Sequence, residues 1–187
     1  MVPPQNSLDI FLYNEVVMPD LKNLIEIISE SNKTLFILCG FPYAGKSYVA
    51  NQLLTQTNIV FVGIDDIFHT HGFDWNTNKL PDTEKWQGIF EESYERVRVA
   101  LKEGKNVLYD STNQTLASRD KLREVAQSFD AVSKVIYIKS PTETVWKRWE
   151  ENQNNLSRSV VSRELVQMTI DMFEEPIESE NVIVIYN

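Results

Sequence analysis

One short segment limits the fold of this chain more than any other: an apolar run is followed by a glycine-bracketed loop that ends in Lys-Ser. The run is TLFILC (34–39), the loop is GFPYAGKS (40–47), and SYVANQLLTQ (47–56) has the pattern of a helix. The loop matches the phosphate-binding pattern G-x-x-x-x-G-K-[ST], the P-loop, which requires this order of strand, loop and helix. Its glycines let backbone N–H groups turn inward, and the helix dipole favours negative charge there. The segment therefore predicts a site for nucleotide phosphates.

We expect the loop to surround the phosphates, with Lys46 at the β- and γ-phosphates and the Ser47 hydroxyl on Mg²⁺. The predicted nucleotide-binding residues of this segment are Gly40, Phe41, Pro42, Tyr43, Ala44, Gly45, Lys46, Ser47 and Tyr48.

Short apolar runs then alternate with amphipathic ones along the chain. Predicted strands cover 34–39, 59–63, 106–109, 134–139 and 182–186, and predicted helices cover 19–30, 47–56, 81–104, 115–129, 141–152 and 162–176. Strands without polar alternation are buried on both faces, and alternation with helices makes them parallel. We therefore expect an open α/β sheet whose ligands bind beyond the carboxyl ends of the strands. Pro81 is expected in the first turn of its helix and Gly104 at the C-terminal cap.

Acidic residues follow two of these strands. Asp65 and Asp66 come after the second, and Asp110 ends the third. A carboxylate at Asp65 can accept the proton of an attacking hydroxyl or orient that hydroxyl, and Asp110 can bind Mg²⁺ directly or through water. The alternative role is local, because an aspartate after a strand commonly caps a turn. Thr115 is expected to cap the helix 115–129.

A polar segment, QNNLSRSV (153–160), follows the helix 141–152, and three cations bracket it: Lys147, Arg148 and Arg158. Such a loop can close over a nucleotide and exclude water, and an arginine that arrives with it stabilises charge on the transferred phosphoryl group. The alternative is a solvated helix face, since Lys147 lies four residues from Glu151.

The loop HTHGFDWNTNKLP (69–81) carries aromatic residues and comes just after Asp65, where an acceptor would lie. Loops in such positions set specificity. The spacing of His69 and His71, without cysteine partners, argues against zinc. For the four tryptophans we expect packing rather than base stacking.

The composition limits the classes of function. The chain has 187 residues, which fits one domain over 1–187, and its formal charge is −9, from 18 Lys and Arg against 27 Asp and Glu. This balance argues against a long nucleic acid as partner, which needs a broad basic face. Cys39 is the only cysteine and is expected to be a small buried residue. With no secretory signal and no run of about 18 apolar residues, we expect a cytoplasmic protein without membrane contact.

In order along the chain, GFPYAGKS, IDDIF, LYDSTN and KRWEENQNN resemble the small P-loop kinases of the polynucleotide-kinase-like and zeta-toxin-like group, often grouped with AAA-type ATP-binding proteins. The resemblance covers about 34–176, and its most specific part is the run of hydrophobic strand, Asp-x-Thr-Asn and helix. It implies a P-loop NTPase three-layer sandwich with a five-stranded parallel sheet in the order 2-3-1-4-5 and a small helical lid. Residues 1–33 have no counterpart and are expected to form an N-terminal helical extension.

The same resemblance implies ATP and Mg²⁺ as cofactors and assigns roles to the candidate residues. Lys46 and Ser47 would hold phosphate and magnesium. Asp65 would be the base for the acceptor hydroxyl, and Arg148 a lid arginine. Together with the roles argued above from position, the expected catalytic residues are Asp65, Lys46 and Arg148, the metal ligands are Ser47 and Asp110, and Arg158 joins the nucleotide-binding residues.

The sequence thus predicts an ATP- and Mg²⁺-dependent kinase that transfers the γ-phosphate to a hydroxyl of a small molecule: a nucleoside, nucleotide, sugar or antibiotic. One alternative is a polynucleotide 5′-hydroxyl kinase. The polynucleotide members carry an arginine three residues past the base, where this chain has Phe68, and the 69–80 loop supplies only Lys79 as a basic group. A second alternative is an ATP-binding switch or slow ATPase without an acceptor.

Overall fold

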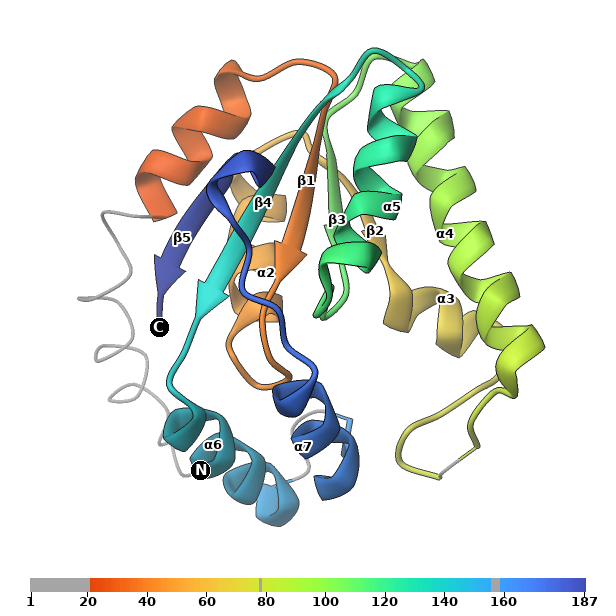
Figure 1. Ribbon diagram of the computed structural model, residues 1–187, viewed down its shortest axis with the longest axis vertical. Helices are drawn as coiled ribbons and strands as arrows, with labels where there is room; N and C mark the ends of the chain where they lie inside the picture. The colour runs from red at the N-terminus through yellow and green to blue at the C-terminus, as the bar shows by residue number, and fades with distance from the viewer. Residues whose placement is uncertain (1–20, 78, 156–158) are drawn as a thin grey trace, which may run out of the picture.

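The centre of the molecule is a sheet of five parallel strands in the order β2-β3-β1-β4-β5 (Figure 1). The computed structural model describes residues 21–77, 79–155 and 159–187. The strands are β1 (Thr34–Cys39), β2 (Val60–Gly63), β3 (Val107–Asp110), β4 (Val132–Lys139) and β5 (Val182–Tyr186). The predicted fold class and strand order are confirmed.

Helices cover both faces of this sheet, so the side chains of β1 are buried on both sides. Leu35, Ile37 and Cys39 face one core with α4 (Thr83–Lys102) and α5 (Leu116–Gln127). Phe36 and Leu38 face a second core with α2 (Lys46–Gln56) and the helix over 21–30. All six residues of β1 are buried, which explains its unbroken apolar run. The result is the predicted three-layer sandwich.

The register places the ends of β2 and β3 side by side. Gly63 of β2 pairs with Asp110 of β3, and Ile37 of β1 pairs with Tyr109. Strand β3 therefore lies between the P-loop, which follows β1, and the residues that follow β2. Asp110 is the acid that stands between these two segments.

The helix ends follow the expected local chemistry in two cases of three. Thr115 caps α5, accepting a hydrogen bond from the Ser118 N–H at 3.2 Å, and Gly104 follows α4 with φ of 75°. Pro81 lies outside α4, so that prediction is wrong. Asp82 is the cap instead, and its carboxylate accepts from the Lys85 N–H at 3.0 Å.

Three predicted loop or helix boundaries are also wrong. The segment after β2 forms a short helix, α3 (Ile64–Thr70), whose buried residues Ile64, Ile67 and Phe68 have helical spacing. Helix α6 (Thr142–Asn155) continues into the predicted polar loop, and α7 (Arg163–Asp171) ends before the predicted limit of 176. The first 20 residues of the predicted N-terminal extension lie outside the described part of the chain. In the remainder of that extension, residues 21–30 form a helix.

A buried ion pair holds the segment between α7 and β5 in place. Arg119 and Glu180 are both almost fully buried, and the Arg119 Nε donates to Glu180 Oε2 at 2.6 Å. The same guanidinium donates to the carbonyls of Asn113 and Glu174 at 3.0 and 2.9 Å. These bonds fix the connection between α7 and β5 against the start of α5.

No helix in the described ranges is long and apolar enough to cross a membrane.

Candidate active site

The P-loop wraps around the ammonium group of Lys46. Lys46 is the first residue of α2, and its Nζ donates to the carbonyls of Gly40 and Phe41 at 2.9 and 2.8 Å. Gly45 precedes the helix with φ of 105°, and Tyr43 has φ of 63° although it is not a glycine. These left-handed positions turn the backbone back on itself, as a loop that surrounds phosphate requires.

The remaining predicted loop residues differ in exposure. Ser47 is exposed at the first turn of α2, Pro42 and Tyr48 are half-buried, and Ala44 is buried. The Phe41 ring packs on Phe173 with ring centroids 4.6 Å apart.

The segment after β3 holds the P-loop to the sheet. The Gly40 N–H donates to the Thr112 carbonyl at 3.1 Å. The buried Asn113 has φ of 45°, and its amide donates to the Leu38 carbonyl at 2.6 Å. The Asp-x-Thr-Asn run therefore has a structural role in addition to any chemical one. Thr112 and Asn113 bind the end of β1 and the first residue of the P-loop.

Lys46 and the acids at the strand ends influence one another electrostatically. Burial lowers the pKa of Lys46, and the carboxylates of Asp110 and Asp65 oppose this shift. Burial also raises the pKa of Asp110 to about 6, with Lys46 opposing and Asp65 and Asp66 adding to the increase. The strand register agrees with these couplings, because Gly63, two residues before Asp65, pairs with Asp110. Lys46, Asp110 and Asp65 therefore lie at the same edge of the sheet and influence one another there.

Asp65 and Asp66 lie in the first turn of α3, where carboxylates favour the positive end of the helix dipole. Both are exposed, and Asp65 Oδ1 accepts a hydrogen bond from the indole N–H of Trp75 at 3.2 Å. Asp66 Oδ2 lies against Gly63 instead. Of the two, Asp65 is the one tied to the loop that follows α3.

Arg148 reaches the P-loop from α6, which lies with α7 beyond the carboxyl ends of the strands (Figure 1). Its Nη1 donates to the Tyr43 carbonyl at 3.2 Å and its Nη2 to Asn187 Oδ1 at 3.3 Å. The Asn187 amide in turn donates to the Ala44 carbonyl at 2.6 Å. Sequence reasoning missed Asn187, because only the fold brings the end of β5 to the P-loop.

The other two predicted cations differ from Arg148. Lys147 is exposed and pairs with Glu151 at 3.9 Å, as a solvated helix face would. Arg158 lies outside the described residues, so its role stays a prediction.

Tyr43 joins the P-loop to the lid, which consists of α6, α7 and residues 159–161, and the lid also contacts the loop after α3. The Tyr43 ring packs with Val145 of α6 and Val166 of α7. Its hydroxyl accepts from the Val161 N–H at 3.3 Å. The neighbouring Val160 N–H donates to Asn76 Oδ1 at 2.8 Å. Neither contact of the 159–161 segment has a signal in the sequence, because both join residues more than 80 positions apart.

The oxygen donors present fit a magnesium ion bound together with nucleotide phosphates. Among the residues that the structure describes, no three His, Cys, Asp or Glu side chains form a metal-binding group. Magnesium at phosphate sites, however, takes one or two protein oxygens and otherwise phosphate and water. The exposed Ser47 hydroxyl and the half-buried Asp110 carboxylate, crowded by other acids, are suitable donors.

The remaining candidates have structural surroundings. Cys39 is buried, burial raises the pKa of its thiol to about 11, and its Sγ donates to the Asn113 carbonyl at 3.4 Å. It is a core residue, as predicted. His71 pairs with Glu92 at 2.7 Å, and His69 Nδ1 lies 3.1 Å from the Phe73 carbonyl.

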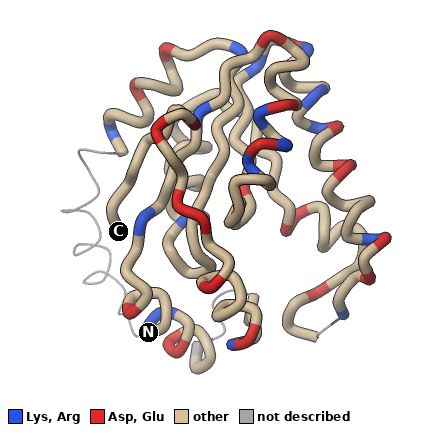
Figure 2. The backbone as a smooth tube through the Cα atoms, in the orientation of Figure 1, with Lys and Arg blue, Asp and Glu red and all other residues tan. Residues whose placement is uncertain are grey.

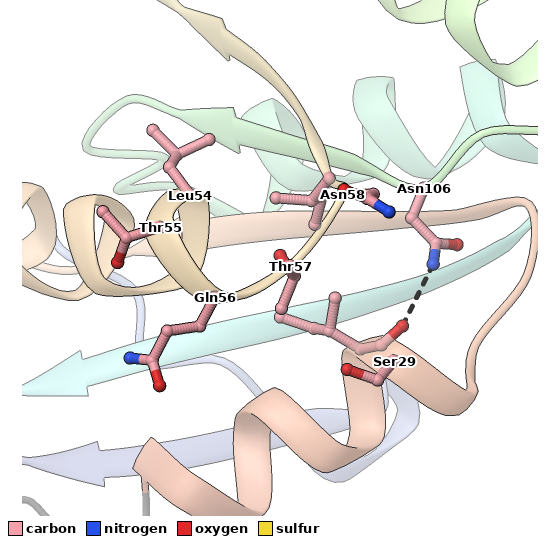
Figure 3. A pocket seen from close by; sticks show the side chains of 9 residues that line it. Ser29, Leu54, Thr55, Gln56, Thr57, Asn58 and Asn106 are labelled. Carbon is pink, nitrogen blue, oxygen red and sulfur yellow. Dashed lines mark hydrogen bonds between the residues drawn. The ribbon is translucent and has the colours of Figure 1, made fainter.

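A surface pocket of about 480 Å³ lies at the other end of the sheet (Figure 3). It is bounded by the helix over 21–30, the C-terminal end of α2 and Asn106, whose amide donates to the Ile28 carbonyl at 3.1 Å. Since Ile59 and Asn106 directly precede β2 and β3, this pocket faces the amino ends of the strands. It is distinct from the predicted site.

Comparison with models of protein families shows to which family this chain belongs. A family model described as "AAA domain" matches residues 35–176. The chain belongs to this AAA domain family. Comparison with curated proteins finds no match.

Solved structures share the fold of this AAA domain, and P-loop kinases are among them. A gluconokinase from Sinorhizobium meliloti 1021 is 16% identical with a TM-score of 0.57, over 82% of this chain and 82% of that one. Kti12 from Chaetomium thermophilum, in complex with ADP-AlF3, is 16% identical with a TM-score of 0.60, over 81% and 88%. A Pnkp1/Rnl/Hen1 complex contains a chain 28% identical with a TM-score of 0.56, over 62% of this chain but 38% of that one.

The raised pKa of Asp110 leads to a prediction about stability. An acid whose pKa is raised to about 6 in the folded protein keeps its proton longer than it does in the unfolded chain. Its ionisation therefore destabilises the fold increasingly as pH rises from about 4 to 6, and fully above that. We expect Asp110→Asn to be about 1–3 kcal/mol more stable than the parent at pH 8. Urea unfolding at pH 8 and pH 4 measures this. The gain should vanish at pH 4, and an equal gain at both pH values would contradict the assignment.

Proposed function

We propose that this AAA domain is a single-domain kinase that transfers the γ-phosphate of ATP to a hydroxyl group of a small molecule. The observation that carries the proposal is the grouping of a P-loop lysine, an acid beside it and a second acid on another segment. Lys46 and Asp110 lie next to the P-loop, where the phosphates would bind. Asp65 lies next to the loop after α3, to which it is hydrogen-bonded through Trp75. A binding module needs the first two, whereas the third serves an acceptor.

The roles follow from position and chemistry. Lys46 and the loop N–H groups would bind the β- and γ-phosphates. Ser47 and Asp110 would hold Mg²⁺, which supplies charge neutralisation between the phosphates when bound. Arg148, already on the P-loop backbone through Tyr43, would stabilise charge on the transferred group.

Asp65 would act on the acceptor. Its carboxylate accepts the hydroxyl proton while the acceptor oxygen bonds to the γ-phosphorus. The bond between this phosphorus and the oxygen that bridges to the β-phosphate breaks, and ADP leaves. The 159–161 segment, in contact with Tyr43 and Asn76, would limit the access of water that competes with the acceptor.

Two features support an acceptor without several phosphates. Residues 63–82 contain four aspartates, at 65, 66, 74 and 82, against one lysine, Lys79, and Figure 2 shows acidic positions at the start of α3 and in the following loop. Phe68, three residues after Asp65, is fully buried and packs against the rings of both Trp75 and Trp86. That position belongs to the core and gives no phosphate contact. The gluconokinase of the same fold is in line with a small hydroxyl acceptor.

A polynucleotide 5′-hydroxyl kinase is the second candidate. The 28% identity to a chain of the Pnkp1/Rnl/Hen1 complex favours it, although it covers only 62% of this chain.

The proposal is tested by transfer of labelled γ-phosphate from ATP to a panel of nucleosides, nucleotides, sugars, aminoglycosides and 5′-hydroxyl oligonucleotides. We expect a small hydroxyl compound to be the best acceptor. Labelling of the oligonucleotide above all small molecules would favour the second candidate. Slow release of phosphate without transfer to any acceptor would favour an ATP-binding switch.

The role of Asp65 gives a sharper prediction. Asp65→Asn keeps the size of the side chain and removes the proton acceptor, so transfer to the best acceptor should fall by roughly 10² to 10⁴-fold. ATP affinity, measured by calorimetry, should stay near the parental value or rise slightly, because the Asp65 carboxylate bonds to Trp75 and its negative charge would repel the triphosphate. Asp66→Asn is the matched control, since it removes the same charge one residue away and should cost far less. If Asp65→Asn transfers phosphate at the parental rate, Asp65 is not the base.

A further inference from the structure

Trp75 makes two contacts with the short helix that carries Asp65. The edge of its indole donates to Asp65 Oδ1 at 3.2 Å. Its face stacks on Phe68, with ring centroids 4.7 Å apart and an angle of 14° between the planes. Asp65 and Phe68 belong to the same helix, α3, one exposed and one fully buried. The indole therefore links an exposed carboxylate to the fixed core of that helix.

A third ring, Trp86 of α4, contacts both Trp75 and Phe68, with its centroid 6.0 Å from that of Trp75. Phe68 also stacks on Trp86, with ring centroids 5.5 Å apart and an angle of 23° between the planes. The ring centroids of Trp86 and Phe90 are 5.8 Å apart. Aromatic contacts of this kind stabilise beyond their buried area and restrict the rotation of each ring. Trp75 thus has little freedom to turn its N–H away from Asp65.

The backbone around Trp75 is held as well. Asp74 and Lys79 exchange two backbone hydrogen bonds of 3.1 Å, and the Asn76 N–H donates to Asp74 Oδ1 at 2.9 Å. Asn76 Oδ1 accepts from Val160 in the segment after α6. The turn that carries Trp75 is therefore held by its own hydrogen bonds, and through Asn76 it is attached to Val160 of the lid.

We propose that Trp75 is a positioning residue: by donating to Oδ1, it fixes the Asp65 carboxylate so that Oδ2 is presented to the acceptor hydroxyl. This inference rests on the proposed function, in which Asp65 is the base. A carboxylate at the exposed first turn of a helix otherwise samples several rotamers, and an oriented base is worth more than a mobile one. Trp75 acts through Asp65 and need not touch the reacting atoms itself.

The test is a double-mutant cycle on the transfer reaction. Trp75→Phe keeps a ring for the stack and removes the N–H, so kcat should fall by about 10-fold while KM for ATP stays constant. Trp86→Phe, in the same stack, is the matched control and should leave kcat within about twofold. In the Asp65→Asn background, Trp75→Phe should cause no further loss. A loss of equal size in both backgrounds, or an equal loss in the control, would show a merely structural role and overturn the proposal.

Two different results distinguish an error in the proposed base from an error in the positioning role. If Asp65→Asn retains parental transfer, the proposed base is wrong, whatever Trp75 does. If Asp65→Asn is impaired but the effect of Trp75→Phe is independent of it, only the positioning role is wrong.

A spectroscopic measurement tests the hydrogen bond without any acceptor. In the ¹H–¹⁵N spectrum, the indole signal that disappears in Trp75→Phe belongs to Trp75. Asp65→Ala should shift this signal, while the Trp86 indole signal, assigned in the same way from Trp86→Phe, should stay in place. A Trp75 signal that does not move would overturn the proposal.

Discussion

The conformation of the P-loop is the constraint on which the rest of the structure depends. The loop must turn back so that it surrounds one point, and it does so through left-handed residues, one of them Tyr43 with φ of 63°. A bulky residue in this region costs about 1–3 kcal/mol, and the conformation persists only where its surroundings hold it there. Here they do, because the Tyr43 ring packs on α6 and α7 and its hydroxyl binds the backbone of the 159–161 segment. The same residue that strains the loop therefore attaches the lid to it.

The charged groups around the loop have pKa values shifted by burial and by one another. Lys46 is half-buried and donates to the carbonyls of its own loop, while Asp110 is coupled electrostatically to two further carboxylates, Asp65 and Asp66. Perturbed groups of opposite sign in one place are typical of functional sites. A buried pair with a purely structural role has a different arrangement: Arg119 and Glu180 satisfy each other and the neighbouring carbonyls.

Sequence reasoning succeeded where the signal is local and failed where distant segments meet. The strands around the P-loop and the cap at Thr115 follow from short patterns, whereas the strand order came from the family resemblance. Helix α3 was missed because seven residues after an apolar strand carry too little periodicity, and its apolar residues resemble a strand end. The pair Arg119–Glu180 and the contact of Trp75 with Asp65 were missed for another reason. Each is a hydrogen bond between side chains that only the folded chain brings together.

The most direct test of the central claim is calorimetric titration of the protein with MgATP, comparing the parent with Lys46→Ala. Loss of a charged hydrogen-bond donor at the phosphates should raise Kd by about 10–100-fold. Lys147→Ala, which removes an exposed lysine of the lid helix, is the control and should bind as the parent does. The account predicts that only the Lys46 variant, still folded, loses affinity. Parental affinity in Lys46→Ala would contradict a phosphate site at this loop and with it the proposed kinase.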